Sequence, residues 1–419
     1  KFSMFWGRDG NELFDASRAQ GIDRPAYHRT AEQHPVLLGD LSSRAYAAAS
    51  SDDHCRHYHR LGNSSRACCI AALNPWRPLF RRPKLRDHGV SMAYLEEHPP
   101  LVSLAPMAGV TDIPFRRQVK AFGGGYCVSE MVASEQLARA RIDMVRRAAG
   151  AGVVAPLVIQ IAGREARWMS AGARLAEEAG ADVIDINMGC PAKSVVSGLC
   201  GSALMRDPDL ALQLVEAVID ATRLPVTLKM RLGWDEHNLN AADIAKRAED
   251  AGVRMLVVHG RTRQQFFRGQ ADWAAIRPVV EAVRIPVIAN GDIGSAADAR
   301  RALDASGAAG VMIGRAAQGR SWLPGAIERA LRNGGEASAP SRAQLLQSLL
   351  TLYDETLAFY DERLGLRVAR KHIAWMIDAE FGTPARETRK AICMLEEPRL
   401  VREALVRLFD TGEREAAAA

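Results

Sequence analysis

The feature that most constrains the fold is a regular succession of short apolar runs that begins at Leu101. Most of them are rich in Val and Ile, and each is short enough to be a strand buried on both faces. Ala-rich amphipathic stretches separate the runs, as expected of helices. Eight strands alternating with helices predict an α/β fold, a (β/α)8 TIM barrel. An open doubly wound sheet is the alternative, but it does not need eight such regular units. The expected strands are Leu101–Ala105, Tyr126–Met131, Pro156–Ala162, Asp182–Asn187, Pro225–Arg231, Met255–Gly260, Pro286–Asp292 and Gly310–Arg315, and the clearest helices are Glu165–Ala179, Asp207–Thr222, Ala241–Ala251 and Ser295–Ser306.

Glycines mark the ends of the expected barrel helices. The pairs Ala179-Gly180, Ala251-Gly252 and Ser306-Gly307 stand where a helix should end and the next strand begin. These regularly placed helix ends support the barrel prediction.

No convincing strand follows the barrel. Residues 336–412 predict a small helical domain, residues 413–419 a tail, and residues 92–335 the barrel domain. The expected helices are Arg342–Leu364, Arg367–Phe381, Thr383–Leu395 and Pro398–Leu408, with breaks at Gly365 and Gly382.

Residues 1–91 differ from the rest of the chain, because they show no sustained period of 2 or 3.6. The cluster from His54 to His59, with Cys68-Cys69 beyond it, lacks the paired spacings of a zinc site. We interpret this region as a disordered or artefactual extension, and we expect the functional protein to begin at Met92.

Composition is that of an ordinary globular protein, with 48% hydrophobic and 25% charged residues. Of the net charge of +6, residues 1–91 supply +5, so bulk charge does not indicate RNA binding by the barrel. An odd number of scattered cysteines, seven, argues against a disulfide framework. The sequence has neither an apolar run of spanning length nor a secretory signal, so it predicts a cytoplasmic protein with no membrane segment. We also expect no bound metal and a monomer.

Polar and turn-forming residues follow every expected strand, at the end where a TIM barrel has its active site. A single such residue could be a helix cap or a satisfied loop residue, but the complete set favours a binding site. The set is Pro106, Met107, Ala108 and Gly109; Glu130; Gln160; Asn187 with Cys190; Lys229 with Arg231; His259 with Arg261; Asn290, Gly291 and Asp292; Gly314 with Arg315.

The last two strand ends favour a phosphorylated ligand. Asn290-Gly291-Asp292 and Gly314-Arg315 follow strands seven and eight, the usual phosphate-binding region of this fold. Glycine lets backbone N–H groups approach an anion, and arginine can bind phosphate with two hydrogen bonds. FMN or a sugar phosphate would fit here.

Three other rim residues could contact a flavin. The Lys229 ammonium could lie beside the N1/O2 edge of the ring, but it could equally form a Schiff base or a plain ion pair. The Gln160 amide suits the pyrimidine edge of a flavin, since it offers both a donor and an acceptor. His259 could contact flavin or substrate, or pair within the barrel.

Cys190 is the strongest candidate for a catalytic thiol. It lies in the segment Asn187-Met188-Gly189-Cys190-Pro191, where Gly189 and Pro191 predict a tight turn that presents the thiol over the barrel mouth. A thiol there could act as a nucleophile or as a proton donor.

Taken together, these motifs resemble those of the bacterial tRNA-dihydrouridine synthases, most closely the B-type branch, which is also named for a nitrogen-regulation locus. The resemblance covers roughly residues 99–410 and leaves out residues 1–91. It rests on Pro106-Met107-Ala108-Gly109-Val110-Thr111-Asp112, Ser129-Glu130-Met131, Gln160-Ile161-Ala162-Gly163, Asp185-Ile186-Asn187-Met188-Gly189-Cys190-Pro191, His259-Gly260-Arg261-Thr262 and Ala289-Asn290-Gly291-Asp292-Ile293.

The resemblance implies an FMN-dependent enzyme that reduces the C5=C6 bond of a tRNA uridine in the D-loop to dihydrouridine. Hydride from flavin N5 would add at C6, and Cys190 would deliver a proton to C5. NADPH would be a transient reductant without a Rossmann domain, since no Gly-x-Gly-x-x-Gly fingerprint is present. The FMN-binding residues it implies are Pro106, Met107, Ala108, Gln160, Lys229, Asn290, Gly291, Asp292, Gly314 and Arg315, with His259 beside them.

A uridine inside folded RNA must be extruded to reach a barrel mouth, and the helical domain is the natural clamp. Arg363, Arg367, Arg370 and Lys371 recur at helical spacing and predict one basic face. Together with Asn187 and Arg231 on the rim, they are the expected RNA contacts. A solvated stripe balanced by Asp361 and Glu362 is the structural alternative.

Two other functions are compatible with the sequence. One is an RNA-binding regulatory protein that has the barrel but no turnover, against which the intact Cys190 and Lys229 argue. The other is an FMN-dependent reductase of free pyrimidines, which leaves the basic helix unexplained.

Overall fold

The computed structural model describes residues 5–6, 13–14 and 94–418. The chain divides into two compact units, Lys1–Cys69 and Ile70–Ala419, each taken here by itself. In the first unit, strands β1 (Phe5–Trp6) and β2 (Leu13–Phe14) pair antiparallel. The cluster from His54 to His59, the pair Cys68-Cys69 and the expected start at Met92 lie outside the described residues.

The second unit contains the predicted TIM barrel. Within the part of the chain that the structure describes, nine strands form one parallel sheet in the order β4-β3-β11-β10-β9-β8-β7-β6-β5. Val128 bridges to Val158, which closes the sheet on itself between its two ends. The strands are β3 (Val102–Leu104), β4 (Tyr126–Cys127), β5 (Val132–Ala133), β6 (Val158–Ala162), β7 (Val183–Met188), β8 (Val226–Arg231), β9 (Met255–His259), β10 (Val287–Asn290) and β11 (Gly310–Ile313).

The second predicted strand, Tyr126–Met131, is interrupted between β4 and β5. The Ser129 hydroxyl, rather than a backbone carbonyl, accepts the hydrogen bond from the Gln160 N–H at 3.0 Å. A hydrogen bond to a side chain therefore replaces one backbone hydrogen bond of the sheet. The chain turns there so that Glu130 faces the barrel rim.

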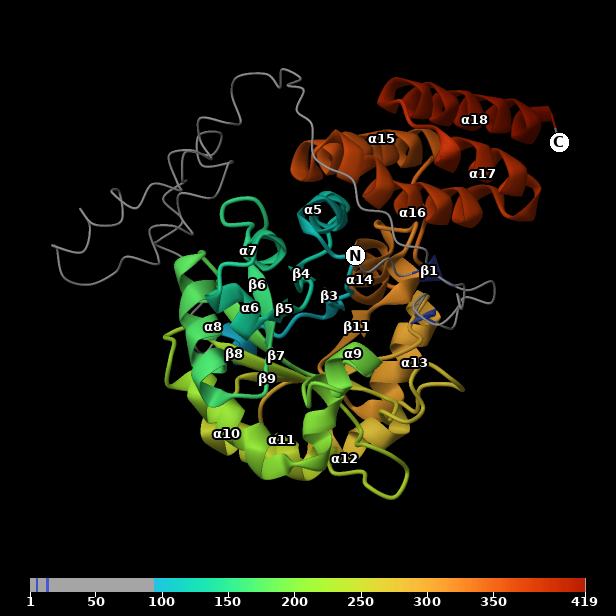
Figure 1. Cartoon of the computed structure of the whole chain (residues 1–419). Helices are drawn as coiled ribbons and strands as arrows, with labels where there is room; N and C mark the ends of the chain where they lie inside the picture. The colour runs from blue at the N-terminus through green and yellow to red at the C-terminus, as the bar shows by residue number, and fades with distance from the viewer. Residues whose placement is uncertain (1–4, 7–12, 15–93, 419) are drawn as a thin grey trace, which may run out of the picture. The chain divides into compact units, whose positions relative to one another are not determined.

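Helices cover the outside of the strands (Figure 1). Asp112, Asp207 and Ser295 cap the N-termini of three of them through side-chain oxygens, and Gly252 and Gly307 end two of them in the left-handed conformation, as their spacing predicted. The helices are α4 (Tyr94–Glu97), α5 (Ile113–Ala121), α6 (Ser134–Ala138), α7 (Ile142–Ala148), α8 (Ala166–Glu178), α9 (Lys193–Val196), α10 (Pro208–Ile219), α11 (Ala241–Ala251), α12 (Arg277–Ala282), α13 (Ala296–Ser306) and α14 (Leu323–Asn333), with 3-10 turns η4 (Gly201–Arg206), η5 (Ala274–Ile276) and η6 (Arg315–Ala317).

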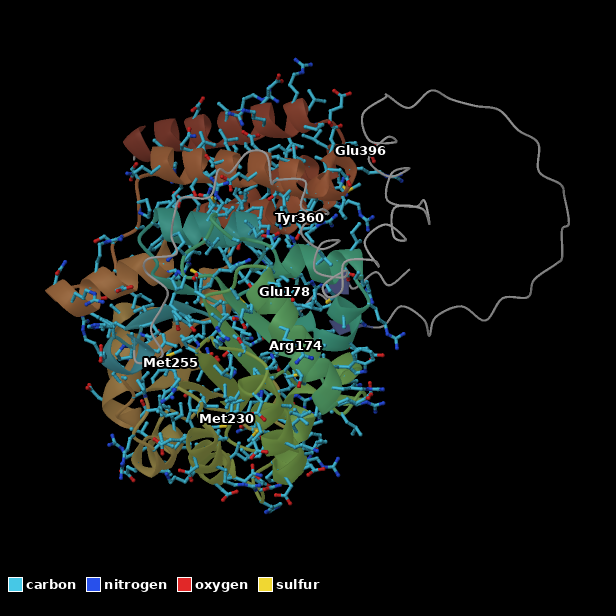
Figure 2. All side chains as sticks on the ribbon, turned by 90° about the vertical axis from the view of Figure 1, so that its left-hand side faces the viewer. Arg174, Glu178, Met230, Met255, Tyr360 and Glu396 are labelled. Carbon is cyan, nitrogen blue, oxygen red and sulfur yellow. The ribbon has the colours of Figure 1, made fainter. Side chains whose placement is uncertain are left out.

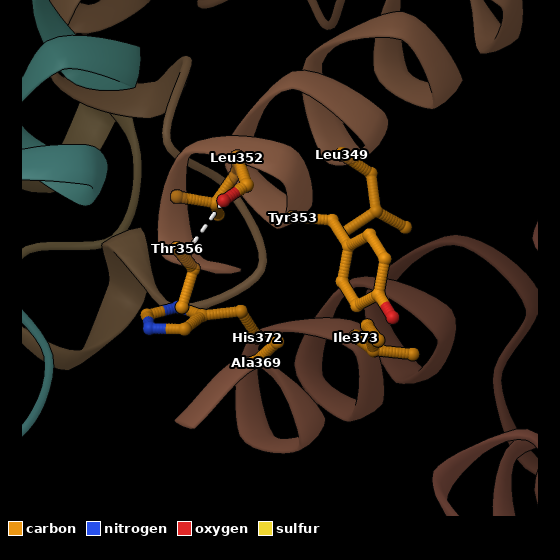
Figure 3. Close-up of a pocket in the computed structure, with 7 residues that line it drawn as sticks. All are labelled: Leu349, Leu352, Tyr353, Thr356, Ala369, His372 and Ile373. Atoms are coloured by element: carbon orange, nitrogen blue, oxygen red, sulfur yellow. Dashed lines mark hydrogen bonds between the residues drawn. The ribbon is translucent and has the colours of Figure 1, made fainter. Parts of the chain in front are cut away.

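The C-terminal region is helical, as expected, and its helices lie side by side (Figure 1). The core between the first two includes Leu349, Tyr353 and Ile373 (Figure 3). The small cavity drawn there has no room for a water molecule. The helices are α15 (Arg342–Tyr360), α16 (Glu362–Phe381), α17 (Arg386–Met394) and α18 (Pro398–Ala418), with the 3-10 turn η7 (Thr383–Ala385).

Two details of this region differ from the prediction. The break between the first two helices is at Asp361, which has a φ of 76°, and Gly365 lies inside α16. A Cβ on Gly365 would lie 2.7 Å from the Cα of Leu357, so this glycine allows α15 and α16 to pack closely instead of ending a helix. The expected tail is also helical, because α18 continues to Ala418 through residues with high helix propensity.

Several contacts join α15 and α16 to the barrel. The Ser348 hydroxyl donates to Gln118 of α5 at 2.8 Å, and both side chains are buried. His372 stacks on Phe115 with ring centroids 5.3 Å apart. At Gly319, just after η6, a Cβ would lie 2.3 Å from the backbone oxygen of Trp375, so the barrel loop and α16 touch backbone to backbone.

Among the described helices, none combines the length and apolarity that a bilayer crossing demands. The described residues also hold no group of three or more His, Cys, Asp or Glu side chains placed to hold a metal ion.

Candidate active site

Strand register brings the predicted polar residues together at the carboxyl end of the barrel. Asn187 of β7 is level with Lys229 of β8, and His259 of β9 is level with both Arg231 and Asn290. Residues two apart on a strand share a face, so Asp185 and Asn187 point the same way. The side chains therefore form a continuous polar layer across neighbouring strands.

Asp185 lies beneath this layer and organises it. Its carboxylate accepts hydrogen bonds from Gln160 Nε2 and Thr227 Oγ1, both at 2.6 Å. Burial raises the pKa of Asp185 to about 6, and the two hydrogen bonds and the charge of Lys229 oppose that rise. Gln160 Oε1 in turn accepts from Asn187 Nδ2 at 2.7 Å. These bonds fix the Gln160 amide with its oxygen toward Asn187, and they leave one hydrogen and one lone pair of that amide free.

The Lys229 ammonium is buried and donates to Asn290 Oδ1 at 3.0 Å. Burial, followed by the charge of Arg231, lowers the pKa of Lys229 to about 8. Asn290 is itself held by a 2.8 Å bond from its Nδ2 to the Met312 carbonyl. Since an ammonium has three hydrogens, two remain for a ligand.

The Cys190 loop is held by side chains on both sides. The Asn187 Oδ1 accepts from the backbone N–H groups of Gly189 at 3.2 Å and Cys190 at 3.0 Å. The Cys190 carbonyl accepts from the hydroxyl of Ser202 at 2.9 Å. The sequence attributes this turn to Gly189 and Pro191, but Gly189 has no left-handed backbone angle, and the Asn187 carboxamide makes the turn.

Burial raises the pKa of the Cys190 thiol, while a backbone N–H and the charges of Arg231 and Lys229 lower it to a smaller extent. The net effect keeps the thiol protonated at neutral pH. A protonated thiol is a proton donor and a poor nucleophile. Of the cysteines in the described residues, Cys127, Cys190, Cys200 and Cys393 are all free.

The residues predicted to bind a phosphate lie on the loops after β10 and β11. Gly291 has a φ of 120°, and a Cβ there would lie 2.6 Å from the Ala271 side chain. Arg315, partly exposed, lies over the Phe267 ring and donates to Asp292 at 3.2 Å. Gly314 precedes Arg315 at the start of η6.

The Asp292 side chain is engaged by other protein groups. Both carboxylate oxygens accept hydrogen bonds from Arg261, and one also accepts from the Ala271 N–H. Burial favours the neutral acid, but these bonds outweigh it and lower the pKa of Asp292. Only its backbone N–H is left for an anion.

The other predicted rim residues are in place. Pro106 and Met107 are half-buried and Ala108 is exposed directly after β3. His259 is close to Arg261, with 3.3 Å between His259 Nε2 and Arg261 Nη1, and burial lowers its pKa well below the usual range.

The predicted RNA contacts fall into two groups. Asn187 and Arg231 are buried, and Arg231 donates to the carbonyls of Gly189, Thr262 and Phe266, so both brace the Cys190 loop. The four basic residues all lie on α16. Arg363 and Arg367 are exposed. Arg370 approaches the Leu395 carbonyl, and Lys371 turns toward Gly109 on the barrel rim.

Sequence reasoning placed Gly109 and Glu130 on the rim but missed Tyr360, which joins the rim to the helical region. Tyr360, at the end of α15, donates to Asp112 at 3.0 Å (its position is labelled in Figure 2), and Glu130 accepts from the Gly109 N–H at 2.5 Å. Asp112 and Tyr360 are far apart in sequence, so no local pattern joins them. Asp185 could have been found from its alternation with Asn187 along one strand.

Comparison with known proteins gives the family. The model of the dihydrouridine synthase (Dus) family matches residues 103–409. The chain belongs to the dihydrouridine synthase family. It is therefore an enzyme, an oxidoreductase, and the resemblance recognised in the sequence motifs is confirmed.

Three relatives show how far the likeness extends. A probable tRNA-dihydrouridine synthase of Rhodobacter capsulatus is 52% identical over 330 residues, which is 78% of this chain and 99% of that protein. One of Rhizobium leguminosarum is 48% identical over 75% of this chain and 98% of that protein. The tRNA-dihydrouridine synthase B of Pseudomonas putida is 45% identical over 75% of this chain and 92% of that protein. Members of the B-type branch are thus among its relatives.

Proposed function

We propose that this enzyme reduces the C5=C6 bond of a uridine in the tRNA D-loop to 5,6-dihydrouridine, using FMN and NADPH. The observation that carries the proposal is the position of Cys190. Its loop is fixed by the Asn187 side chain, which is hydrogen-bonded to Gln160 on one neighbouring strand and level with Lys229 on the other. The names of the relatives supply tRNA as the substrate.

The residues present fit FMN. The glycine backbone at Gly291, the turn at Gly314 and the Arg315 guanidinium suit the phosphate, and Asp292 would add its N–H. Gln160 and Lys229 have free hydrogen-bonding capacity for the pyrimidine edge, while Asn290 fixes Lys229. Pro106, Met107 and Ala108 would border the ring, with His259 beside the phosphate loops. Bound FMN would supply the hydride that reduces C6.

Cys190 holds the proton for C5. The buried thiol stays protonated at neutral pH. As hydride adds to C6, negative charge develops toward the C4 carbonyl, and transfer of the thiol proton to C5 completes the saturated ring. The resulting thiolate lies near the charges of Arg231 and Lys229, which stabilise it until it regains a proton.

The helical domain, residues 336–412, is the proposed tRNA clamp. The exposed Arg363 and Arg367 on α16 would contact the phosphate backbone. We infer a cytoplasmic location, where tRNA is modified.

Replacing Cys190 tests the proposal directly. Cys190→Ala should purify yellow with bound FMN but form dihydrouridine at least about a hundredfold more slowly, because general acid catalysis contributes roughly 10²–10⁴. Mass spectrometry of tRNA from a deletion strain would locate the uridine, and Cys200→Ala is the matched control that should keep full activity. A colourless folded wild-type protein, or full activity in Cys190→Ala, would contradict the proposal.

A further inference from the structure

An open cavity of about 210 Å³ lies between the barrel rim and the helical region. It is bounded by the loop after β3, by α5 and α7, and by the ends of α15 and α16. At about 30 Å³ per water molecule, it has room for a small polyatomic group. The cavity is lined by Gly109, Asp112, Ile113, Arg116, Glu130, Asp143, Arg146, Arg147, Phe359, Tyr360, Leu364, Val368 and Lys371.

Arg116 is the unusual residue of this lining. Its side chain is among the largest that are fully buried, with 1% exposure. Within the part of the chain that the structure describes, its Nε and Nη1 atoms have no hydrogen-bond partner. Guanidinium nitrogens that are removed from water without hydrogen bonds are costly. The charges of Asp112 and Glu130 act on Arg116 but offset only part of the effect of burial, which still lowers its pKa. The arrangement becomes favourable when an anion enters the cavity.

Three other basic side chains line the cavity, and they differ in the partners that they already have. Arg146 lies over the Tyr360 ring at 5.2 Å, which leaves its N–H groups in the ring plane free to bind. Arg147 donates to the Met131 carbonyl and lies 3.8 Å from Glu130. The Lys371 ammonium lies 3.7 Å from where a Gly109 Cβ would be.

The carboxylates in the lining are occupied by protein donors. Asp112 accepts from the Phe115 N–H and the Tyr360 hydroxyl, and Glu130 accepts from the Gly109 N–H. Asp143 is bound through both oxygens by Arg141. Burial, followed by the charge of Glu130, raises the pKa of Asp112 to about 6, so this carboxylate still carries its charge at neutral pH. The lining nevertheless has four basic side chains against three carboxylates. The balance in the cavity is positive.

We propose that this cavity binds a phosphate group, with Arg116 at its base and Arg146 and Lys371 at its sides. The proposal rests on the proposed function for the source of that group, which is either an RNA phosphodiester beside the reduced uridine or the 2′-phosphate of NADPH, which NADH lacks. Gly109 borders the cavity and directly follows Ala108, the last residue of the first segment proposed to hold FMN.

The first experiment uses inorganic phosphate alone and does not depend on turnover. Phosphate should raise the melting temperature of the full-length protein more than chloride does at equal ionic strength. The increment should disappear in Arg116→Met, which keeps the volume of the buried side chain, and in Arg146→Gln, which changes a partly exposed residue and should not impair folding. Arg223→Gln, before β8 at the opposite end of the barrel, is the control and should keep the increment.

The second experiment identifies the source. If RNA supplies the phosphate, Arg116→Met and Arg146→Gln should raise KM for tRNA roughly tenfold or more, since a charge-assisted contact is worth about 1.5–3 kcal/mol, and flavin reduction by NADPH in the absence of tRNA should be unchanged. If NADPH supplies it, reduction by NADPH should slow and reduction by NADH should not.

Two results would overturn the proposal. One is the absence of a phosphate-specific increment in the wild type, and the other is an increment that survives both substitutions. Neither result bears on whether the enzyme makes dihydrouridine, so failure of this inference and failure of the proposed function are distinguishable.

Discussion

At the scale of single residues, the site depends on side chains whose charge state is set by burial. Lys229 keeps a proton only up to about pH 8, whereas burial keeps the Cys190 thiol protonated beyond the usual range. The cation and the acid assigned to the reaction are therefore present together at neutral pH. As pH rises, the lysine loses its charge first.

FMN affinity should accordingly fall as pH rises through about 8, because a lysine is charged only below its pKa. Flavin fluorescence, followed as protein is added to FMN at several pH values between 7 and 9.5, would give the dissociation constant at each pH. Working above pH 7 avoids the titration of the flavin phosphate itself, at roughly pH 6. Lys229→Met should bind FMN more weakly and show no such slope. A wild type and a Lys229→Met variant with equal slopes would disprove the role of Lys229.

Gly291 sets the backbone of the proposed phosphate loop. Gly291→Ala forces a Cβ to within 2.6 Å of Ala271 and about 3 Å of the His259 ring, at a φ that L-residues rarely adopt. We expect loss of bound flavin and a drop in stability of about 1–3 kcal/mol. Absorbance at purification and chemical denaturation measure the two effects. Retention of full flavin content would show that the phosphate lies elsewhere.

At the scale of elements, glycines have two opposite roles in this chain. Gly252 and Gly307 end helices, whereas Gly365 is a packing contact near the start of one, α16. The sequence does not distinguish these roles, because the difference lies in what faces the glycine across the helix interface.

Gly365→Ala gives a test in which two effects differ in sign. Helix propensity alone predicts a gain of about 1 kcal/mol. The clash with Leu357 Cα and Thr356 O, at 2.7 and 3.0 Å from the new Cβ, predicts a net loss of about 1–3 kcal/mol. Urea denaturation measures which effect dominates. A more stable variant would mean that α15 and α16 separate without cost.

The parts of the structure that follow from local sequence were predicted from it. Alternating Val- and Ile-rich runs and helix-ending glycines predicted the barrel, and Cys190 stood out because its neighbours are those of a loop. The break at Gly365 was predicted wrongly. The helix ends instead at Asp361, which has a positive φ that its residue type does not predict. The cavity around Arg116 could not be predicted, because its walls come from residues more than two hundred positions apart.

At the scale of the whole molecule, the barrel and the helical region within Ile70–Ala419 are joined by buried polar bonds as well as by apolar packing. Tyr360 reaches Asp112, Ser348 reaches Gln118, and His372 stacks on Phe115. Burial makes His372 neutral, and both of its ring nitrogens lack a partner within the described part of the chain. It serves as an aromatic ring at this junction.

Because of these bonds, we expect the barrel and the helical region to unfold in one calorimetric transition. In the double variant Tyr360→Phe with Ser348→Ala, Asp112 and Gln118 each lose one hydrogen bond. Each loss should lower the free energy of unfolding by about 1–3 kcal/mol. It should lower the melting temperature and broaden or split the transition. Thr351→Ala, at a partly exposed residue of α15 whose hydroxyl donates to Gln347 of the same helix, is the control. Two well-separated transitions in the wild type would show that the regions are independent.

The backbone contact at Gly319 has a thermodynamic consequence. The loop that would receive the cofactor phosphate continues directly into the segment that touches α16, where tRNA is proposed to bind. We therefore expect a ligand that orders one side of this contact to order the other as well. Since linkage between two binding sites is reciprocal, whatever factor FMN contributes to tRNA affinity, tRNA must contribute equally to FMN affinity. Cofactor retention would then report on RNA occupancy.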